Sequence, residues 1–272
     1  MKNKILSTKL LPDQIALFYL GQVGFIIKFR EKYIMIDGYL SDYVDKNCGS
    51  EDVKWVRKYP QPIEPDELDF IDYIFCTHLH YDHTDPYTLS TVSRINKKAK
   101  VFASSAVFGS IYEYGFEKER VIGLDTDKEY EIENDISVTA IPSAHEEIHT
   151  DENGNALEVG FILNLGGKKV YHSGDCCAYD GLCKRLTDVS IGIMPINGRD
   201  YFRRYEQDII GCFDSRETLT VAKKANIDTV IPVHFDLYDI NKVSPAQFVD
   251  TLIEINPNQK FHIFVPGERF LY

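Results

Sequence analysis

The stretch THLHYDHTD, residues 77–85, decides both the fold and the site, because it places three histidines and two aspartates in nine positions. It directly follows the apolar run IDYIFC, and the whole chain contains only eight histidines. A polar surface loop would be the simpler interpretation of an isolated pair of histidines. The full pattern, at the junction of a predicted strand and a predicted helix, favours a metal site instead.

The order of these side chains fits two neighbouring metal ions. His78 and His80 stand two positions apart at the expected end of a strand, so both should project to the same side. The chain must turn before the helix expected after Asp85, and this turn can direct Asp82 and His83 toward a second point. Imidazole and carboxylate ligands suit Zn(II), Mn(II) or Fe(II), and histidine-rich sets favour zinc.

One loop rarely completes a binuclear site, and three further candidates follow other apolar runs. His145 comes after ISVTAI, Asp175 after KVYHS and His234 after TVIPV. Because loops at strand ends line a shared rim, we expect these side chains to converge on the first loop. Alternatives remain for each of them. His149 rivals His145 as the ligand, Asp175 could be a turn residue, and His234 could be a satisfied core histidine.

Composition limits the class of protein. The 272 residues have 44% apolar content, which is enough for a substantial core. Thirty Lys and Arg against 42 Asp and Glu give a net charge of -12, so the protein repels nucleic acids and acidic membranes. No signal sequence or membrane-length apolar run is visible, and the six cysteines show no CxxC spacing. We therefore expect a cytoplasmic protein with reduced thiols and a small substrate, either as a monomer or as a homo-oligomer.

Short β-branched and aromatic runs predict strands, and three longer amphipathic runs predict helices. The expected strands cover residues 15–20, 24–29, 33–37, 73–77, 100–104, 136–141, 160–165, 169–173, 189–195, 229–234 and 261–265. The expected helices cover residues 86–98, 215–226 and 244–255, with Asp85, Asp214 and Ser244 as N-caps. Early strands are consecutive and later ones alternate with helices. This order predicts one α+β (α/β) domain over residues 1–272, built as a layered sandwich of sheets and helices.

The candidate residues resemble the signature of the metallo-β-lactamase superfamily, a His-x-His-x-Asp-His loop followed by a later His, Asp and His in that order. The resemblance implies a four-layer αββα sandwich with two metal ions at one edge. It assigns His78, His80 and His145 to one ion, Asp82, His83 and His234 to the other, and Asp175 to a bridge between them. It also implies that Asp37, at the end of an early strand, supports the metal loop without binding metal.

Several segments are similar to the ascorbate-6-phosphate lactonase group of that superfamily, namely FYLGQVGFIIKF, IDYIFCTHLHYDHTD, VYHSGD, NGRD and VIPVHFDLYD. That group is longer and has no histidine at the position of His145. The resemblance therefore implies a shared class of activity, the metal-dependent hydrolysis of a small ester or lactone. A sugar-phosphate lactone is the expected substrate, and a phosphodiester or a thioester is the alternative.

The expected chemistry needs no protein nucleophile, because two divalent ions generate hydroxide from water near neutral pH and polarise the reacting oxygen. Asp82 is the best candidate to orient this water or to accept its proton. No Gly-x-Ser-x-Gly motif is present, and we expect Cys176 and Cys177 to pack as small thiols. A non-catalytic binding protein would be expected to lose ligands, whereas all seven candidate positions are filled.

The segment INGRDYFRRYEQD, residues 196–208, concentrates three arginines in an acidic chain. Arginine forks bind phosphate and carboxylate, so we expect Arg199, Arg203 and Arg204 to hold a small anionic substrate. Asn197 is expected to bond the hydroxyl groups of that substrate. The alternative is a surface loop whose arginines pair with the carboxylates that surround them.

Overall fold

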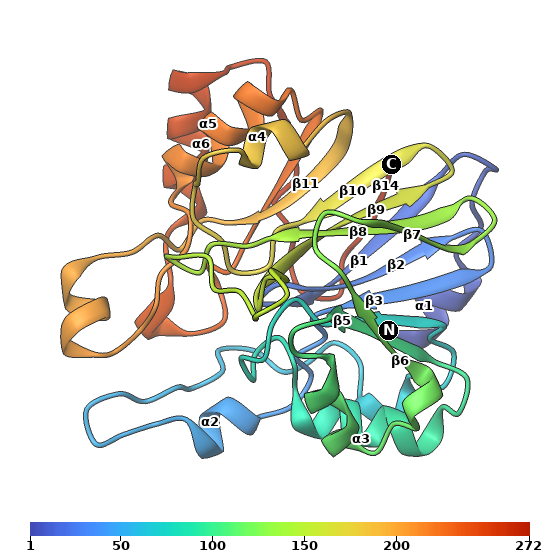
Figure 1. The fold of residues 1–272 in the computed structure, drawn as a ribbon. Coiled ribbons are helices and arrows are strands. Elements are labelled where there is room, and N and C mark those ends of the chain that lie inside the picture. The colour runs from blue at the N-terminus through green and yellow to red at the C-terminus, as the bar shows by residue number, and fades with distance from the viewer.

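The computed structural model describes residues 1–272 and contains two seven-stranded mixed sheets that lie face to face (Figure 1). The first sheet has the order β14-β1-β2-β3-β4-β5-β6, and the second has the order β13-β12-β11-β10-β9-β8-β7. The strands of the first sheet are β1 (Ile15–Gly21), β2 (Gly24–Phe29), β3 (Lys32–Ile36), β4 (Tyr73–Phe75), β5 (Lys100–Ser104), β6 (Val121–Leu124) and β14 (Arg269–Leu271). Those of the second sheet are β7 (Glu129–Glu133), β8 (Ile136–Pro142), β9 (Val159–Leu165), β10 (Lys168–His172), β11 (Val189–Pro195), β12 (Thr229–Val233) and β13 (Lys260–Phe261).

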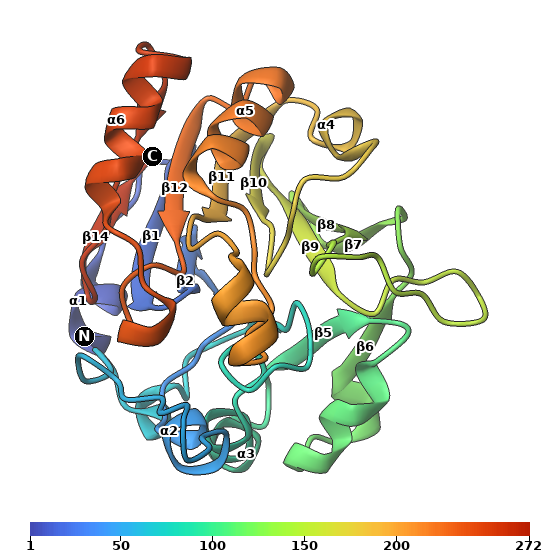
Figure 2. The same cartoon turned by 90° about the vertical axis from the view of Figure 1, so that its left-hand side faces the viewer.

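Helices cover the outer face of each sheet, as Figures 1 and 2 show from two directions. The first sheet carries α1 (Lys2–Ser7) and α3 (Pro86–Ile95), while α2 (Tyr43–Asn47) lies near the site. The second sheet carries α4 (Leu182–Arg185), α5 (Ser215–Ala225) and α6 (Pro245–Ile255). Four layers result, in the order helices, sheet, sheet, helices, which confirms the expected sandwich.

Three apolar clusters hold these layers together. The largest contains 27 buried residues and lies between the two sheets, and clusters of 20 and 17 residues attach the helices on either side. A strand covered on both faces needs apolar side chains throughout, which is why all seven residues of β1 are buried. No helix is both long and apolar enough to cross a membrane.

The helix starts follow the predicted caps. The side chain of Asp85 accepts the backbone N–H of Tyr87, and Asp214 accepts that of Glu217 at the start of α5. Ser244 caps α6 in the same way. These caps fix where each helix leaves its loop, and the first of them ends the histidine-rich stretch.

Three strands were missed by the sequence patterns. β7 reads EYEIE, and its charged residues hide the alternation because it is an edge strand with a wet face. β6 and β14 are only four and three residues long, which is too short for a periodic signal. The strand expected at residues 261–265 is reduced to the two-residue β13, which pairs with β12 through Thr229 and Val230.

Candidate metal centre

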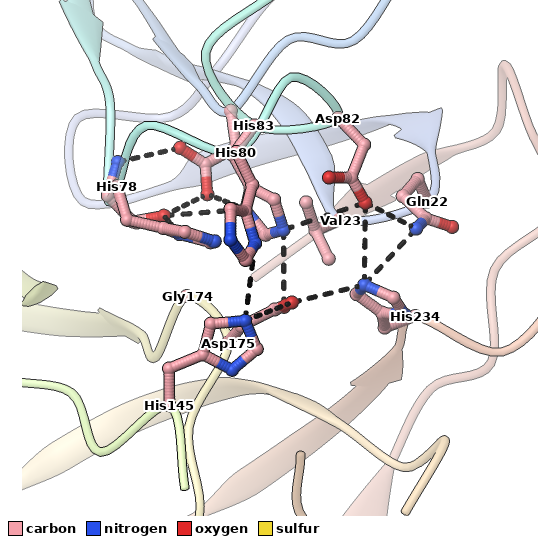
Figure 3. Close-up of polar contacts among 12 residues, drawn as sticks. Gln22, Val23, His78, His80, Asp82, His83, His145, Gly174, Asp175 and His234 are labelled. Atoms are coloured by element: carbon pink, nitrogen blue, oxygen red, sulfur yellow. Dashed lines mark hydrogen bonds and ion pairs between the residues drawn. The ribbon is translucent and has the colours of Figure 1, made fainter. Parts of the chain in front are cut away.

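Seven side chains from four loops meet at one edge of the sandwich (Figure 3). Their possible ligand atoms form two groups, within each of which all atoms lie within 4.8 Å of one another. The first group contains His78, His80, His145 and Asp175, and the second contains Asp82, His83 and His234. We call these seven residues the cluster. The structure thus brings together every residue that the sequence singled out as a metal ligand.

Asp175 lies between the two groups. Its Oδ1 is 3.2 Å from His83 Nε2, and its Oδ2 is 3.3 Å from His234 Nε2 and 3.7 Å from His145 Nε2. Oδ2 alone therefore lies near one histidine of each group, His145 and His234, and the carboxylate has the position of a ligand shared by two ions.

Unpartnered buried atoms show that the cluster fits metal ions. Eight buried side-chain nitrogen and oxygen atoms have no hydrogen-bond partner in the protein, and five of them belong to the cluster. The five are His78 Nε2, His83 Nε2, His145 Nδ1, Asp175 Oδ1 and His234 Nδ1. Leaving a buried polar atom unpaired costs about 1 to 3 kcal/mol. Imidazole and carboxylate groups are the ligands that zinc, manganese and iron accept, so divalent cations would satisfy His78 Nε2, His83 Nε2 and Asp175 Oδ1, whereas His145 and His234 face the cluster with Nε2.

Asp37 supports the histidine-rich loop from behind. Its fully buried carboxylate accepts hydrogen bonds from the backbone N–H of Thr77 at 2.9 Å and from the Thr77 hydroxyl at 2.6 Å. The same carboxylate lies 2.8 Å from His83 Nδ1. This contact assigns the proton to Nδ1 of His83 and leaves Nε2 free to face the cluster.

The strand before the loop is shorter than expected, which corrects the placement of His78 and His80 at a strand end. β4 ends at Phe75, since the N–H of Thr77 donates to the Asp37 carboxylate instead of to a neighbouring strand. Both histidines consequently lie in the loop, and they reach the same group through the turn. Gly174, with φ of +59°, lets the opposite loop approach, because a Cβ there would lie 2.8 Å from Thr77 Cβ.

Electrostatics within the cluster favour shared protons when no cation is bound. Burial lowers the pKa of His145 to about 4. Burial acts in the same direction on His234, but the carboxylates of Asp175 and Asp82 outweigh it and raise its pKa to about 9. Burial also raises the pKa of Asp175, yet His234 and His83 hold it well below the usual range. A metal ion would take the place of these ring protons.

The rival histidine lies outside the cluster. His149 has a side chain that is 53% exposed, and its Nδ1 is 3.3 Å from Glu158 Oε2. His145 is 5% exposed, and its Nε2 lies 3.2 Å from His80 Nδ1. The geometry places His145 in the cluster and His149 outside it.

Sequence reasoning missed Gln22, which lies in the turn between β1 and β2. Its Nε2 donates to Asp82 Oδ2 at 2.9 Å and lies 3.2 Å from His234 Nε2 (Figure 3). A glutamine in a glycine-flanked turn carries no metal motif. Gln22 belongs to the segment FYLGQVGFIIKF, but that segment indicated only a resemblance to a family and no role for the glutamine.

A cavity of about 810 Å³ opens over the cluster. Two protruding segments form its walls, one around α2 and one around residues 205–210, and they project from the same side of the sandwich in Figure 1. Its 21 lining residues include Trp55, Tyr81, Tyr205 and Tyr238, together with aliphatic side chains. Lysine and arginine are absent from this lining, whereas five carboxylates belong to it.

The three arginines of the segment 196–208 are all paired with carboxylates. Arg199 forms two hydrogen bonds of 2.7 Å with Glu217. Arg204 bonds Glu146 at 2.8 Å and Asp208 at 3.2 Å. Arg199 and Arg204 line a second cavity of about 770 Å³, which shares His145 with the first.

Arg203 and Asn197 have structural partners as well. Arg203 forms an ion pair with Asp200 and donates to Asn241 Oδ1 at 2.7 Å and to the carbonyl oxygen of Asn197 at 2.9 Å. Asn197 is buried and donates its Nδ2 to Asn241 Oδ1 at 3.1 Å. These contacts do not form the clamp on a substrate anion that the sequence predicted. Asn197 and Arg203 both donate to Asn241, and Asn241 is the residue of the three that lines the main cavity.

Comparison with known families gives a match over most of the chain. The family described as Beta-lactamase superfamily domain matches residues 34–235. A UPF0173 metal-dependent hydrolase of Caldivirga maquilingensis is 25% identical over 258 residues, which cover 92% of this chain and 95% of that protein. A UPF0173 metal-dependent hydrolase of Saccharolobus solfataricus is 27% identical over 239 residues, covering 85% of this chain and 88% of the other.

Solved structures share the fold at lower sequence identity. An isothiocyanate hydrolase from Delia radicum gut bacteria has a TM-score of 0.73 and 18% identity, covering 94% of this chain and 98% of that one. A metallo hydrolase from Ignicoccus hospitalis has a TM-score of 0.69 and 19% identity, covering 95% and 98%. At such identities the likeness concerns the fold alone.

Proposed function

The chain belongs to the β-lactamase superfamily domain family and is a metal-dependent hydrolase, and we propose that its cluster holds two divalent ions and that its substrate is a small, uncharged ester or lactone. His78, His80 and His145 would hold one ion, while Asp82, His83 and His234 would hold the other, with Asp175 shared. When bound, the ions lower the pKa of water toward neutrality and polarise the carbonyl oxygen of the substrate.

Asp82 has the position of a proton acceptor beside the ions. Its Oδ2 accepts the Gln22 amide, whereas its Oδ1 has no partner within the protein, and the residue lines the main cavity. Burial raises the pKa of Asp82, but His83 and His234 more than offset this and hold it below the usual range. The carboxylate is therefore ionised at neutral pH and can orient a water molecule through Oδ1, although its lowered pKa makes it a weak proton acceptor.

The charge of the cavity supports an uncharged substrate, and this is the observation on which the proposal rests. Two divalent ions would more than offset the carboxylates of Asp82 and Asp175, but in the outer cavity, where Arg204 pairs with Asp208, the carboxylates of Asp52 and Glu206 form no ion pair and leave that part negative. A phosphate group on the body of the substrate would meet no cationic side chain there. The sugar-phosphate lactone expected from sequence is accordingly replaced by a lactone or ester whose apolar part contacts Trp55 and Tyr238.

A hydrolysis panel tests this proposal. We expect neutral aryl esters and lactones to be hydrolysed faster, measured as kcat/KM, than phosphorylated lactones and phosphodiesters by the metal-loaded protein. Arg199→Ala should change kcat/KM by less than about threefold on each substrate, because the exposed pair with Glu217 serves stability and is worth about 1 kcal/mol or less. Faster turnover of a phosphorylated lactone, with a large loss in Arg199→Ala on that compound alone, would instead restore the anion clamp.

A further inference from the structure

Gln22 reaches the second group of the cluster from the turn between β1 and β2. Its side chain is buried, and the end of its amide faces Asp82 and His234 (Figure 3). We propose that Gln22 supplies its amide oxygen as an additional ligand of the second ion, which the proposed function assigns to Asp82, His83 and His234.

The separations between atoms are those of ligands around one ion. Ligands at the usual metal distances stand roughly 3 to 3.5 Å apart. Gln22 Nε2 lies 2.9 Å from Asp82 Oδ2 and 3.2 Å from His234 Nε2, closer than the 3.6 Å between those two ligand atoms. The end of the Gln22 side chain thus has the spacing expected of a ligand beside Asp82 and His234, and it faces the same point as they do.

The orientation of the amide follows from the charge beside it. Without a cation, the nitrogen faces the carboxylate of Asp82, because the NH₂ group is the donor. Rotation of the amide by 180° would put Oε1 at the same point, where a cation attracts it. Oε1 has no hydrogen-bond partner elsewhere, so this rotation would break only the bond to Asp82 and the contact with His234.

The backbone of Gln22 is held in place on both sides. Its carbonyl oxygen accepts the backbone N–H of His234 at 2.8 Å, and its own N–H donates to the Tyr59 hydroxyl at 3.1 Å. Tyr59 in turn donates to Asp236 at 2.8 Å. Gln22 and His234 both have left-handed backbones, with φ of 56° and 59°. Each such conformation costs about 1 kcal/mol or more in a residue other than glycine, and it aims both side chains at the second group.

The additional oxygen would make the ligand sets of the two metal positions chemically different. The first group offers three imidazoles and shares Asp175, a nitrogen-rich set that suits zinc. The second would gain oxygen ligands from Gln22 and Asp82 besides the shared carboxylate, and oxygen ligands suit manganese. We therefore expect the second position to prefer Mn(II) and the first to prefer Zn(II).

Titration of the purified, metal-free protein with Mn(II) tests this assignment, with free Mn(II) followed by electron paramagnetic resonance. Gln22→Ala should weaken the tighter of the two Mn(II) sites, the second position, about 10- to 100-fold and leave affinity at the first position unchanged. Gln22→Glu keeps an oxygen ligand and should retain tight binding of both ions. Gln22→Asn tolerates the left-handed backbone but withdraws the amide, and it should behave as Gln22→Ala even if alanine disturbs folding.

Gln259 provides the matched control, since it is a buried glutamine whose Nε2 donates to the carbonyl oxygens of Ile227 and Asp228, outside the cluster. Gln259→Ala should bind both ions as the wild type does. The assignment is overturned if Gln22→Ala and Gln22→Asn bind the second ion normally, if Gln22→Glu is as weak as Gln22→Ala, or if the wild type binds only one ion. A wild type that binds two ions but hydrolyses no ester or lactone would refute the proposed function and leave this assignment intact.

Discussion

Replacing Asp37 by Asn should lower the affinity for the second ion, although Asp37 is not one of the proposed ligands. The wild-type carboxylate accepts three hydrogen bonds, two from Thr77 and one from His83 Nδ1, and it is fully buried. Bonds to a charged group contribute about 1.5 to 3 kcal/mol each. An amide can accept with only one of its two terminal atoms, so one or two of these bonds are lost. We expect the free energy of unfolding to fall by about 2 to 5 kcal/mol.

Metal affinity separates this effect from general destabilisation. Loss of the partner that orients a histidine ligand typically costs about 10- to 100-fold in affinity, and His83 belongs to the second group only. Competition with a chromophoric chelator measures this loss, and urea denaturation of the metal-free protein measures stability. Asn tolerates the left-handed backbone of Asp37, with φ of 45°, so no new strain enters.

Asp72→Asn serves as the control, because Asp72 is partly buried and accepts the N–H of Tyr33 far from the cluster. It should lower stability by a smaller amount and leave both affinities unchanged. If Asp37→Asn bound both ions as the wild type does, the assignment of Asp37 as the support of His83 would be refuted.

Three further outcomes follow from the same geometry. His145→Ala should empty the first position, whereas His149→Ala should not, because His149 is exposed and pairs with Glu158; metal analysis showing the reverse would exchange their roles. Asp175→Ala should weaken both ions, since its carboxylate lies near His145 of the first group and near His83 and His234 of the second, and loss of a single ion would exclude a bridge. Metal affinity should rise with pH: the pKa of His234, raised to about 9, keeps its ring protonated at pH 7, and an ion must displace that proton. Burial lowers the pKa of His83, but the carboxylates of Asp175 and Asp82 raise it well above its usual value, so this ring must release a proton too. Release of at least one proton predicts a gain of about tenfold or more per pH unit up to pH 9, and pH-independent affinity between 7 and 9 would contradict it.

The sequence was sufficient to predict the cluster, because each of its residues follows an apolar run and strand ends meet at one edge of a sheet. Asp37, at the end of β3, was indicated only by the resemblance to the metallo-β-lactamase superfamily. The N-caps Asp85 and Asp214 were also predictable, since a cap depends on only a few neighbouring residues.

Other features depend on contacts that no local pattern encodes. Arg199 and Glu217 are 18 positions apart, on a loop and on α5, so their pairing could be seen only in the tertiary structure. Gln22 was hidden because its role depends on contact with His234, another left-handed residue, which is 212 positions away in the sequence. The length of β4 depends on Asp37, a side chain 40 positions from Thr77 that replaces a backbone partner.

The most direct test of the proposed centre is the number of metal ions bound by the purified protein after it has been supplied with both zinc and manganese. Inductively coupled plasma mass spectrometry, with the protein concentration taken from amino-acid analysis, gives this number per chain. We expect two transition-metal ions per chain in the folded wild type, and the loss of ester hydrolysis when a chelator removes them. A folded protein that holds only trace metal under these conditions, or one whose hydrolysis survives complete removal of metal, would contradict a binuclear centre built from the cluster.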